Sequence, residues 1–206
     1  MRLFALLLAC ASFFLSPGVQ AQQTPDALVK SVTDEVLDII RKDKDIKAGS
    51  TRRAIELVEQ KVLPHFNFSR MTALAVGRDW RQATPEQQKA LTEEFRDLLV
   101  RTYSNALTAY KNETVDYRPF KMQPGETDVT VRTQIHQSGA RQPIKLDYSL
   151  ERNGNAWKVY DVVVADVSLV TNYRSSFATE IRNGGIDGLV KTLKAKNSSL
   201  EAANRK

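Results

Sequence analysis

The sequence is poor in the side chains that most often carry out chemistry. It has one cysteine, Cys10, and two histidines, His65 and His136. A single thiol cannot form an internal disulfide, and neither histidine has a second histidine or a carboxylate at the spacing that metal ligands take on a helix or strand. We therefore expect no disulfide, no metal site and no cofactor.

Several sequence motifs are missing as well. No glycine-rich loop with its lysine is present to hold the phosphates of ATP, and no G-x-S-x-G elbow presents a serine nucleophile. No basic run carries the interleaved aromatic residues that a nucleic-acid groove uses. The apolar run at residues 3–15 is shorter than the roughly 20 residues that a membrane-spanning helix needs. These absences argue against catalysis, ATP use, nucleic-acid binding and a membrane bundle.

What remains is an ordinary globular composition. The chain has 206 residues, of which 42% are hydrophobic and 26% charged, and its formal net charge is +6. A chain of this length usually forms one domain and can enclose a cavity as well as a core. The positive charge is spread along the sequence, so it favours solubility, and a weak attraction to anionic membrane surfaces is the second interpretation.

The first 21 residues have the pattern of a secretory signal peptide. Arg2 supplies a positive start, residues 3–15 are apolar, residues 16–18 break the helix, and Val19-Gln20-Ala21 offers small residues for cleavage. A membrane anchor, or a lipoprotein box ending at Cys10, is the less favoured alternative. Cleavage would remove Cys10 and leave an exported protein without thiols.

Residues 25–111 have the apolar periodicity of helices. The pattern predicts a first helix at residues 25–43, a second at 51–63 and a short third that ends at Gly77. Thr84-Pro85-Glu86-Gln87 has the residues of a capping box, so it predicts the start of a long helix that runs to about residue 111.

After residue 112 the apolar spacing alternates, which predicts strands. Three strands are expected at residues 129–135, 144–150 and 157–165, and a less certain one at 114–120. Asn153-Gly154 is a strong hairpin signal. Two closing helices are expected at residues 168–182 and 186–196, separated by Asn183-Gly184-Gly185.

These elements predict an α+β fold, with a curved antiparallel sheet of about four strands packed against the long helix. We expect one domain over residues 22–196. Its helical part covers residues 25–111, its sheet 113–165 and its C-terminal helices 168–196, followed by a loose polar tail at 197–206. A sheet wrapped over a long helix tends to form a cone, which is either filled or hollow.

Several blocks of sequence, in order, resemble the MlaC family. They are Phe68-Ser69-Arg70-Met71, Val76-Gly77-Arg78-Asp79-Trp80-Arg81 with Thr84-Pro85-Glu86-Gln87, Trp157-Lys158-Val159-Tyr160-Asp161-Val162, Ser168-Leu169-Val170, Tyr173-Arg174 and Gly185-Ile186-Asp187-Gly188-Leu189. The resemblance covers residues 26–194. One departure is Asn67, which stands between two phenylalanines where relatives tend to have an acidic residue.

The resemblance implies a fold and a function. The fold is a cone of the nuclear-transport-factor-2-like kind with additional helices, and the function is that of a periplasmic phospholipid carrier, also known as a toluene-tolerance auxiliary protein. Its implied partners are phospholipid as cargo, the substrate-binding subunit of an inner-membrane ABC transporter and an outer-membrane lipoprotein complex. The chain is expected to act as a monomer and not as an enzyme.

The family has no short catalytic motif, so the candidate site comes from the apolar faces. We predict that the lipid pocket is lined by the sheet's apolar face and the helical stripes opposite it. The predicted pocket residues are Met71, Leu74, Phe95, Leu99, Tyr103, Leu107, Val131, Ile135, Ile144, Leu146, Tyr148, Val164 and Leu169. For each of these residues, ordinary core packing is an equal alternative. Arg78 or Arg81 at the mouth is a candidate for phosphate contact, although plain solvent exposure is the favoured interpretation.

Two other functions stay open at the level of sequence. A cone-fold isomerase or dehydratase for a small apolar substrate would use Asp161 as its base, which requires that carboxylate to face inward and to be desolvated. Alternatively, the cone is filled and the chain is a docking or scaffold subunit. The direction of transport, the head-group preference and the number of acyl chains held do not follow from the sequence.

Overall fold

The fold is described here from a computed structural model, which describes residues 23–204. The predicted signal peptide at residues 1–21 and the last two residues of the predicted polar tail lie outside the described residues. In chain order the helices and strands are α1 (Pro25–Lys42), α2 (Lys44–Lys47), α3 (Thr51–Lys61), α4 (Phe68–Val76), α5 (Pro85–Tyr103), β1 (Thr114–Tyr117), β2 (Asp128–His136), β3 (Ile144–Asn153), β4 (Ala156–Val164), β5 (Val167–Ser168) and α6 (Arg174–Asn204). Short 3-10 helices occupy Leu63–His65, Gly77–Gln82, Ser104–Leu107 and Thr171–Tyr173.

The long helix α5 begins as the sequence predicts and ends earlier than expected. The Thr84 hydroxyl accepts a hydrogen bond from the Gln87 amide at 3.2 Å, and the Gln87 side chain accepts one from the Thr84 amide at 3.0 Å. After Tyr103 the chain tightens into a 3-10 turn instead of continuing to residue 111. The Thr108 hydroxyl donates to the Asn105 carbonyl at 2.8 Å, and such local side-chain bonds compete with helix continuation.

The sheet is a fully antiparallel meander in the order β1-β2-β3-β4-β5. The hairpin predicted at Asn153-Gly154 is present, with Gly154 at φ 59°, a conformation that favours glycine. The fifth strand was not predicted because it contains two residues. A β-bulge at Ser149/Leu150 shifts the register between β3 and β4. The α+β class is confirmed, with five strands instead of about four.

The C-terminal end differs most from the prediction. The two closing helices appear as one element, α6, that breaks at Gly185, where φ is 68° and ψ is −172°. The helix starts at Arg174, because residues 168–173 form β5 and a 3-10 turn, and it continues to Asn204. The predicted loose tail from residue 197 was wrong. Asn197 is buried, and its amide donates to the Glu94 carbonyl and carboxylate at 2.9 and 2.8 Å, so a polar sequence is held by contacts with α5.

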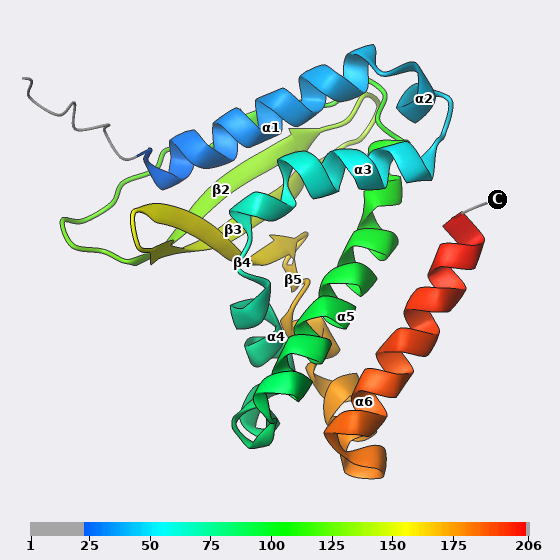
Figure 1. The fold of residues 1–206 in the computed structure, drawn as a ribbon. Coiled ribbons are helices and arrows are strands. Elements are labelled where there is room, and N and C mark those ends of the chain that lie inside the picture. The colour runs from blue at the N-terminus through cyan, green and yellow to red at the C-terminus, as the bar shows by residue number, and fades with distance from the viewer. Residues whose placement is uncertain (1–22, 205–206) are drawn as a thin grey trace, which may run out of the picture.

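The helices cover the two faces of the sheet differently (Figure 1). α1 lies along one face, where Leu28 and Val29 pack with sheet residues. α4 is tied to residues of the other face, and the second half of α6 runs beside α5, with Asn204 reaching the Arg101 carbonyl. We call the face under α1 the inner face and the opposite one the outer face.

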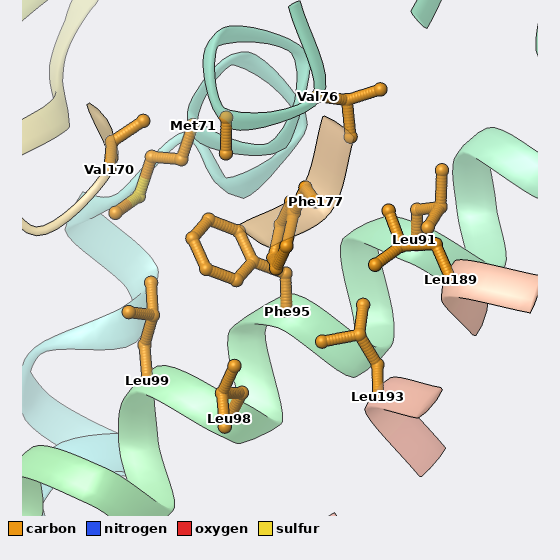
Figure 2. Packing of buried hydrophobic residues seen from close by; sticks show 11 residues of the cluster. Met71, Val76, Leu91, Phe95, Leu98, Leu99, Val170, Phe177, Leu189 and Leu193 are labelled. Atoms are coloured by element: carbon orange, nitrogen blue, oxygen red, sulfur yellow. The ribbon is translucent and has the colours of Figure 1, made fainter. Parts of the chain in front are cut away.

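The apolar core is divided into three clusters. One joins α4, α5 and α6 around Phe95 and Phe177, whose rings meet edge to face at 5.2 Å between centroids (Figure 2). A second joins α1 to the inner face, and a third joins α1, α2 and α3. Among the described residues, the first two clusters share only the partly buried Phe66.

Candidate functional site

The inner face of the sheet changes from closed to open along the strands. Because side chains alternate between faces, every second residue of β2, β3 and β4 points to the inner face. We call a set of inner-face residues that are partners across neighbouring strands a rung. The first rung, Val129, Leu150 and Val159, is 8%, 0% and 4% exposed. This end of the inner face is therefore packed as a solid core.

The second rung marks the change. It consists of Val131, Tyr148 and Val162, of which the two valines are buried. Burial raises the pKa of the Tyr148 phenol to about 12, yet the residue keeps part of its surface accessible. The Tyr148 side chain packs against the inner-face cluster that includes Leu28 and Val29 of α1.

The remaining rungs are more open. In the third, Thr133 of β2 is 1% exposed, but Leu146 and Val164 are partly exposed, and Val167 of β5, which pairs with Val164, is 51% exposed. In the fourth, Ile135 and Ile144 face each other and are both partly exposed. Leaving several large aliphatic side chains partly uncovered forfeits burial energy, about 25 cal/mol for each Å². We call these two rungs the open rungs.

The apolar stripe of α5 opens along its length as well. Phe95 is 0% exposed, Leu99 7% and Tyr103 38%. Burial together with the nearby Tyr103 raises the pKa of the Tyr173 phenol. Tyr173 follows β5 closely in the chain, and its ring meets Phe95 of α5 edge to face at 5.2 Å between centroids, which ties α5 to the segment that leaves the open rungs.

A polar network fixes the outer face at the position of the bulge. The Arg70 guanidinium contacts Glu151 at 2.5 Å and Asp128 at 2.7 Å, and lies 3.5 Å from the centroid of the Tyr160 ring. The Tyr160 hydroxyl donates to Asp128 at 2.6 Å, and the Asn67 amide donates to Glu151 at 2.6 Å. α4 is thereby joined to three strands. We call these five residues the Arg70 clamp.

A separate cleft of about 800 Å³ lies between α3, α5 and the end of α6. Its lining is largely charged and includes Arg52, Glu56, Arg96, Asp97 and Arg101. A site for an apolar ligand needs mostly apolar walls, so this cleft is not the candidate site.

Three comparisons with known proteins agree on the family. Residues 30–195 match the family model described as MlaC protein. The chain belongs to the MlaC family. Over 168 residues, which are 81% of this chain and 77% of the relative, it is 28% identical to the toluene tolerance protein ttg2D of Pseudomonas putida. Over 188 residues, 90% of this chain and 87% of the relative, it is 24% identical to the intermembrane phospholipid transport system binding protein MlaC of Haemophilus influenzae.

A solved structure of a phospholipid-binding protein resembles this one. The phospholipid-binding protein from Ralstonia solanacearum, determined in complex with a phospholipid, is 41% identical and superposes with a TM-score of 0.79. The match covers 85% of this chain and 98% of the Ralstonia chain. The MlaC fold expected from the sequence is thus confirmed.

The predicted pocket residues of this MlaC-family chain do not all meet. Ile135, Ile144, Leu146, Tyr148, Val164 and Leu169 belong to the inner face or pack beside it, and are partly exposed. Met71, Phe95 and Val131 are at most 2% exposed, so their side chains are core behind the wall and offer no surface to a ligand. Leu74 and Leu99 belong to the helical cluster, and Leu107 packs in the cluster under α1 and α3.

Sequence reasoning missed residues that reach the same region from outside the regular pattern. Thr33 is a polar residue on the buried side of α1, and Tyr117 of β1 places its phenol near the same threonine. Phe120 and Met122 pack against the inner-face cluster from the loop between β1 and β2. Only Thr33 carried a signal, as a hydroxyl next to the apolar stripe of an amphipathic helix.

The polar residues considered for catalysis have structural partners. Asp161 accepts hydrogen bonds from the Ser168 hydroxyl at 2.7 Å and the Val170 amide at 3.3 Å, which hold the turn after β5. Asp161 neighbours Val162 in β4 and therefore points to the outer face, away from the open rungs. His136 lies at the surface, 2.9 Å from Asp116. Within residues 23–204 there is no cluster of metal-binding side chains, and no helix there is both long and apolar enough to cross a membrane.

Proposed function

We propose that this protein is a periplasmic carrier that holds phospholipid acyl chains against the open rungs and moves the lipid between the outer and inner membranes. The observation that carries the proposal is the partly exposed apolar surface of Leu146, Val164, Ile135 and Ile144, on the same face as the buried rung of Val129, Leu150 and Val159. The phospholipid complex of the Ralstonia relative and the transport-system name of the Haemophilus relative support it.

The energetics favour a carrier that exchanges lipid directly with a membrane over a protein that releases its lipid into water. Each methylene withdrawn from water contributes about 0.8 kcal/mol, so two chains of about 16 carbons would be favoured over water by roughly 25 kcal/mol. That exceeds the roughly 18 to 21 kcal/mol at which measured affinities saturate, so spontaneous release into water would be far too slow. Exchange between a bilayer and an apolar site is nearly balanced, because both environments are hydrocarbon.

The carrier therefore needs docking partners instead of a catalytic group. We propose that the partners are an outer-membrane lipoprotein complex and the substrate-binding subunit of an inner-membrane ABC transporter, and that the energy for directed transport comes from the transporter. The proposed cargo is phospholipid, bound without a cofactor. The enzyme alternative is not favoured, because Asp161 points away from the open rungs and is engaged by Ser168.

The test is lipid carriage by the protein with a charge placed on the open rungs. Organic extraction of the purified wild type should release phospholipid, detected by mass spectrometry. In Leu146→Asp, a carboxylate would face the acyl chains without a partner, at a cost of about 3 kcal/mol or more, so bound lipid should fall at least a hundredfold.

The matched control is Lys145→Asp, which places the same carboxylate on the neighbouring, exposed residue of the outer face. It should carry wild-type amounts of lipid, and circular dichroism should show that both variants fold. Wild-type protein from which no lipid can be extracted or loaded, or a folded Leu146→Asp with wild-type lipid content, would refute the proposal.

A further inference from the structure

The boundary between the closed rung and the open rungs has a definite structure. We propose that Tyr148 is the floor of the acyl-chain site and limits the length of the chains that the protein accepts. This inference rests on the proposed function and adds a determinant of substrate choice. The geometry around Tyr148 supports it in three ways.

First, the Tyr148 side chain spans the space between sheet and helix. The residue lies on β3, and its side chain packs against the cluster that joins the inner face to Leu28 and Val29 of α1. The ring therefore crosses from the inner face to the helix that covers it. Its cross-strand neighbours Val131 and Val162 are 1% and 8% exposed, so they close the row on both sides of the ring.

Second, the open rungs all lie on one side of this ring. Moving from Tyr148 toward Ile144, the inner-face residues of β3 are partly exposed, whereas Leu150 in the other direction is fully buried. Ile144 and Tyr148 lie four positions apart along β3, so the stretch between them is about 13 Å long. An acyl chain that reaches the sheet past Ile144 would meet the Tyr148 ring at the inner end of this stretch.

Third, the floor is held in place on both faces of the sheet. The Tyr117 hydroxyl donates to Asp34 of α1 at 3.0 Å, so α1 is fixed to β1 beside the floor. The β-bulge at Ser149/Leu150 lies next to Tyr148, and Tyr160 at this bulge is held by the Arg70 clamp. Bulges are common next to functional sites, where they aim a side chain.

If Tyr148 is a fixed floor, the free energy of lipid uptake depends on the length of the acyl chains. A methylene that cannot fit in the site would have to remain in contact with water, while the same methylene in a donor bilayer stays buried. Each methylene beyond the limit should therefore lower uptake roughly fourfold. Below the limit, uptake should depend little on length, since bilayer and site are both hydrocarbon.

The experiment measures uptake from vesicles that contain an equimolar series of diacyl phosphatidylethanolamines of graded chain length. The protein is separated from the vesicles, and its lipids are extracted and quantified by mass spectrometry. Wild type should show a cut-off in chain length. Tyr148→Ala, which removes the ring, should move the cut-off to longer chains, whereas Tyr148→Phe keeps the ring and should keep the wild-type cut-off.

Two further variants protect the test from a failure to fold. Tyr148→Leu keeps an apolar side chain and should shift the cut-off in the same direction by less. Leu146→Trp fills the rung in front of the floor and should shift it to shorter chains. Wild-type lipid uptake without any cut-off, or a folded and lipid-binding Tyr148→Leu with an unchanged cut-off, would overturn the inference and leave the proposed function intact. Loss of all uptake by the wild type would instead refute the proposed function.

Discussion

Removing the Arg70 side chain should destabilise the protein far more than removing an exposed arginine. Arg70→Ala deletes contacts with Glu151 and Asp128 and the stacking on Tyr160. The Arg70 and Glu151 side chains are 32% and 19% exposed, so the network is partly buried. In this variant the Glu151 carboxylate keeps its hydrogen bond from Asn67, the N-cap residue of α4, but loses its contact with a positive charge.

The expected magnitude lies between two measured limits for ion pairs. Exposed pairs contribute about 0.2 to 1 kcal/mol, and breaking a fully buried pair costs about 3 to 5 kcal/mol. A cation–π contact adds about 0.5 to 1 kcal/mol. We therefore expect Arg70→Ala to lower the free energy of unfolding by about 2 to 3 kcal/mol, which corresponds to a fall in Tm of roughly 5 to 10 °C for a chain of this size.

The assay is urea unfolding followed by circular dichroism, with Arg132→Ala as the matched control. Arg132 also pairs with a carboxylate of the sheet, Asp147, but at 3.6 Å and with 65% of its side chain exposed. That variant should lose less than about 0.5 kcal/mol. If the two arginine variants lost the same small amount, the Arg70 clamp would contribute no more than a surface ion pair and the reasoning would be wrong.

Two other predictions concern the glycine backbone in α6 and the ionisation of Tyr148. Gly185→Ala should lower the free energy of unfolding by about 1 to 3 kcal/mol, since φ 68° with ψ −172° is a conformation that only glycine adopts readily. Gly184→Ala, at a helical position without positive φ, should raise the free energy of unfolding by about 0.5 to 1 kcal/mol. Thermal unfolding in which both variants shift Tm in the same direction would contradict this. The raised pKa of Tyr148 gives stability that is complete below pH 10 and is lost as the pH rises to about 12, because the unfolded chain ionises first. Urea titrations over that range should show Tyr148→Phe losing about 2 kcal/mol less than wild type; parallel losses would mean that the phenol is not buried.

Local sequence signals predicted the elements that depend on local interactions. The capping box at Thr84 places the start of α5, and Asn153-Gly154 places the hairpin, because each motif satisfies its own backbone. The end of α5 and the extent of α6 were not predictable in this way. Asn197 and its polar neighbours have a composition typical of a loose tail, and contacts with α5, such as Asn197 with Glu94 and Glu201 with Arg101, hold that segment as a helix.

The sequence predicted which residues lie on the inner face, but not which of them are partly exposed. Alternation correctly placed Val131, Leu146 and Tyr148 on one side of the sheet, since strand geometry alone requires it. It could not separate the buried Val131 from the partly exposed Leu146, because both are aliphatic residues in the middle of strands. The difference depends on where α1 lies over the sheet, which is set by contacts between residues far apart in the chain, such as Asp34 and Tyr117, 83 positions apart.

The divided core has an energetic consequence for a carrier. A single closed core would bury Ile135, Ile144, Leu146 and Val164 completely and would make the protein more stable, but it would leave no apolar surface for a ligand. Here the closed helical cluster around Phe95 and the Arg70 clamp supply stability at one end, so the open rungs can stay partly uncovered at the other. Under the proposed function, bound acyl chains complete the burial that the polypeptide leaves unfinished. Lipid should then stabilise the folded protein in proportion to the apolar area it covers.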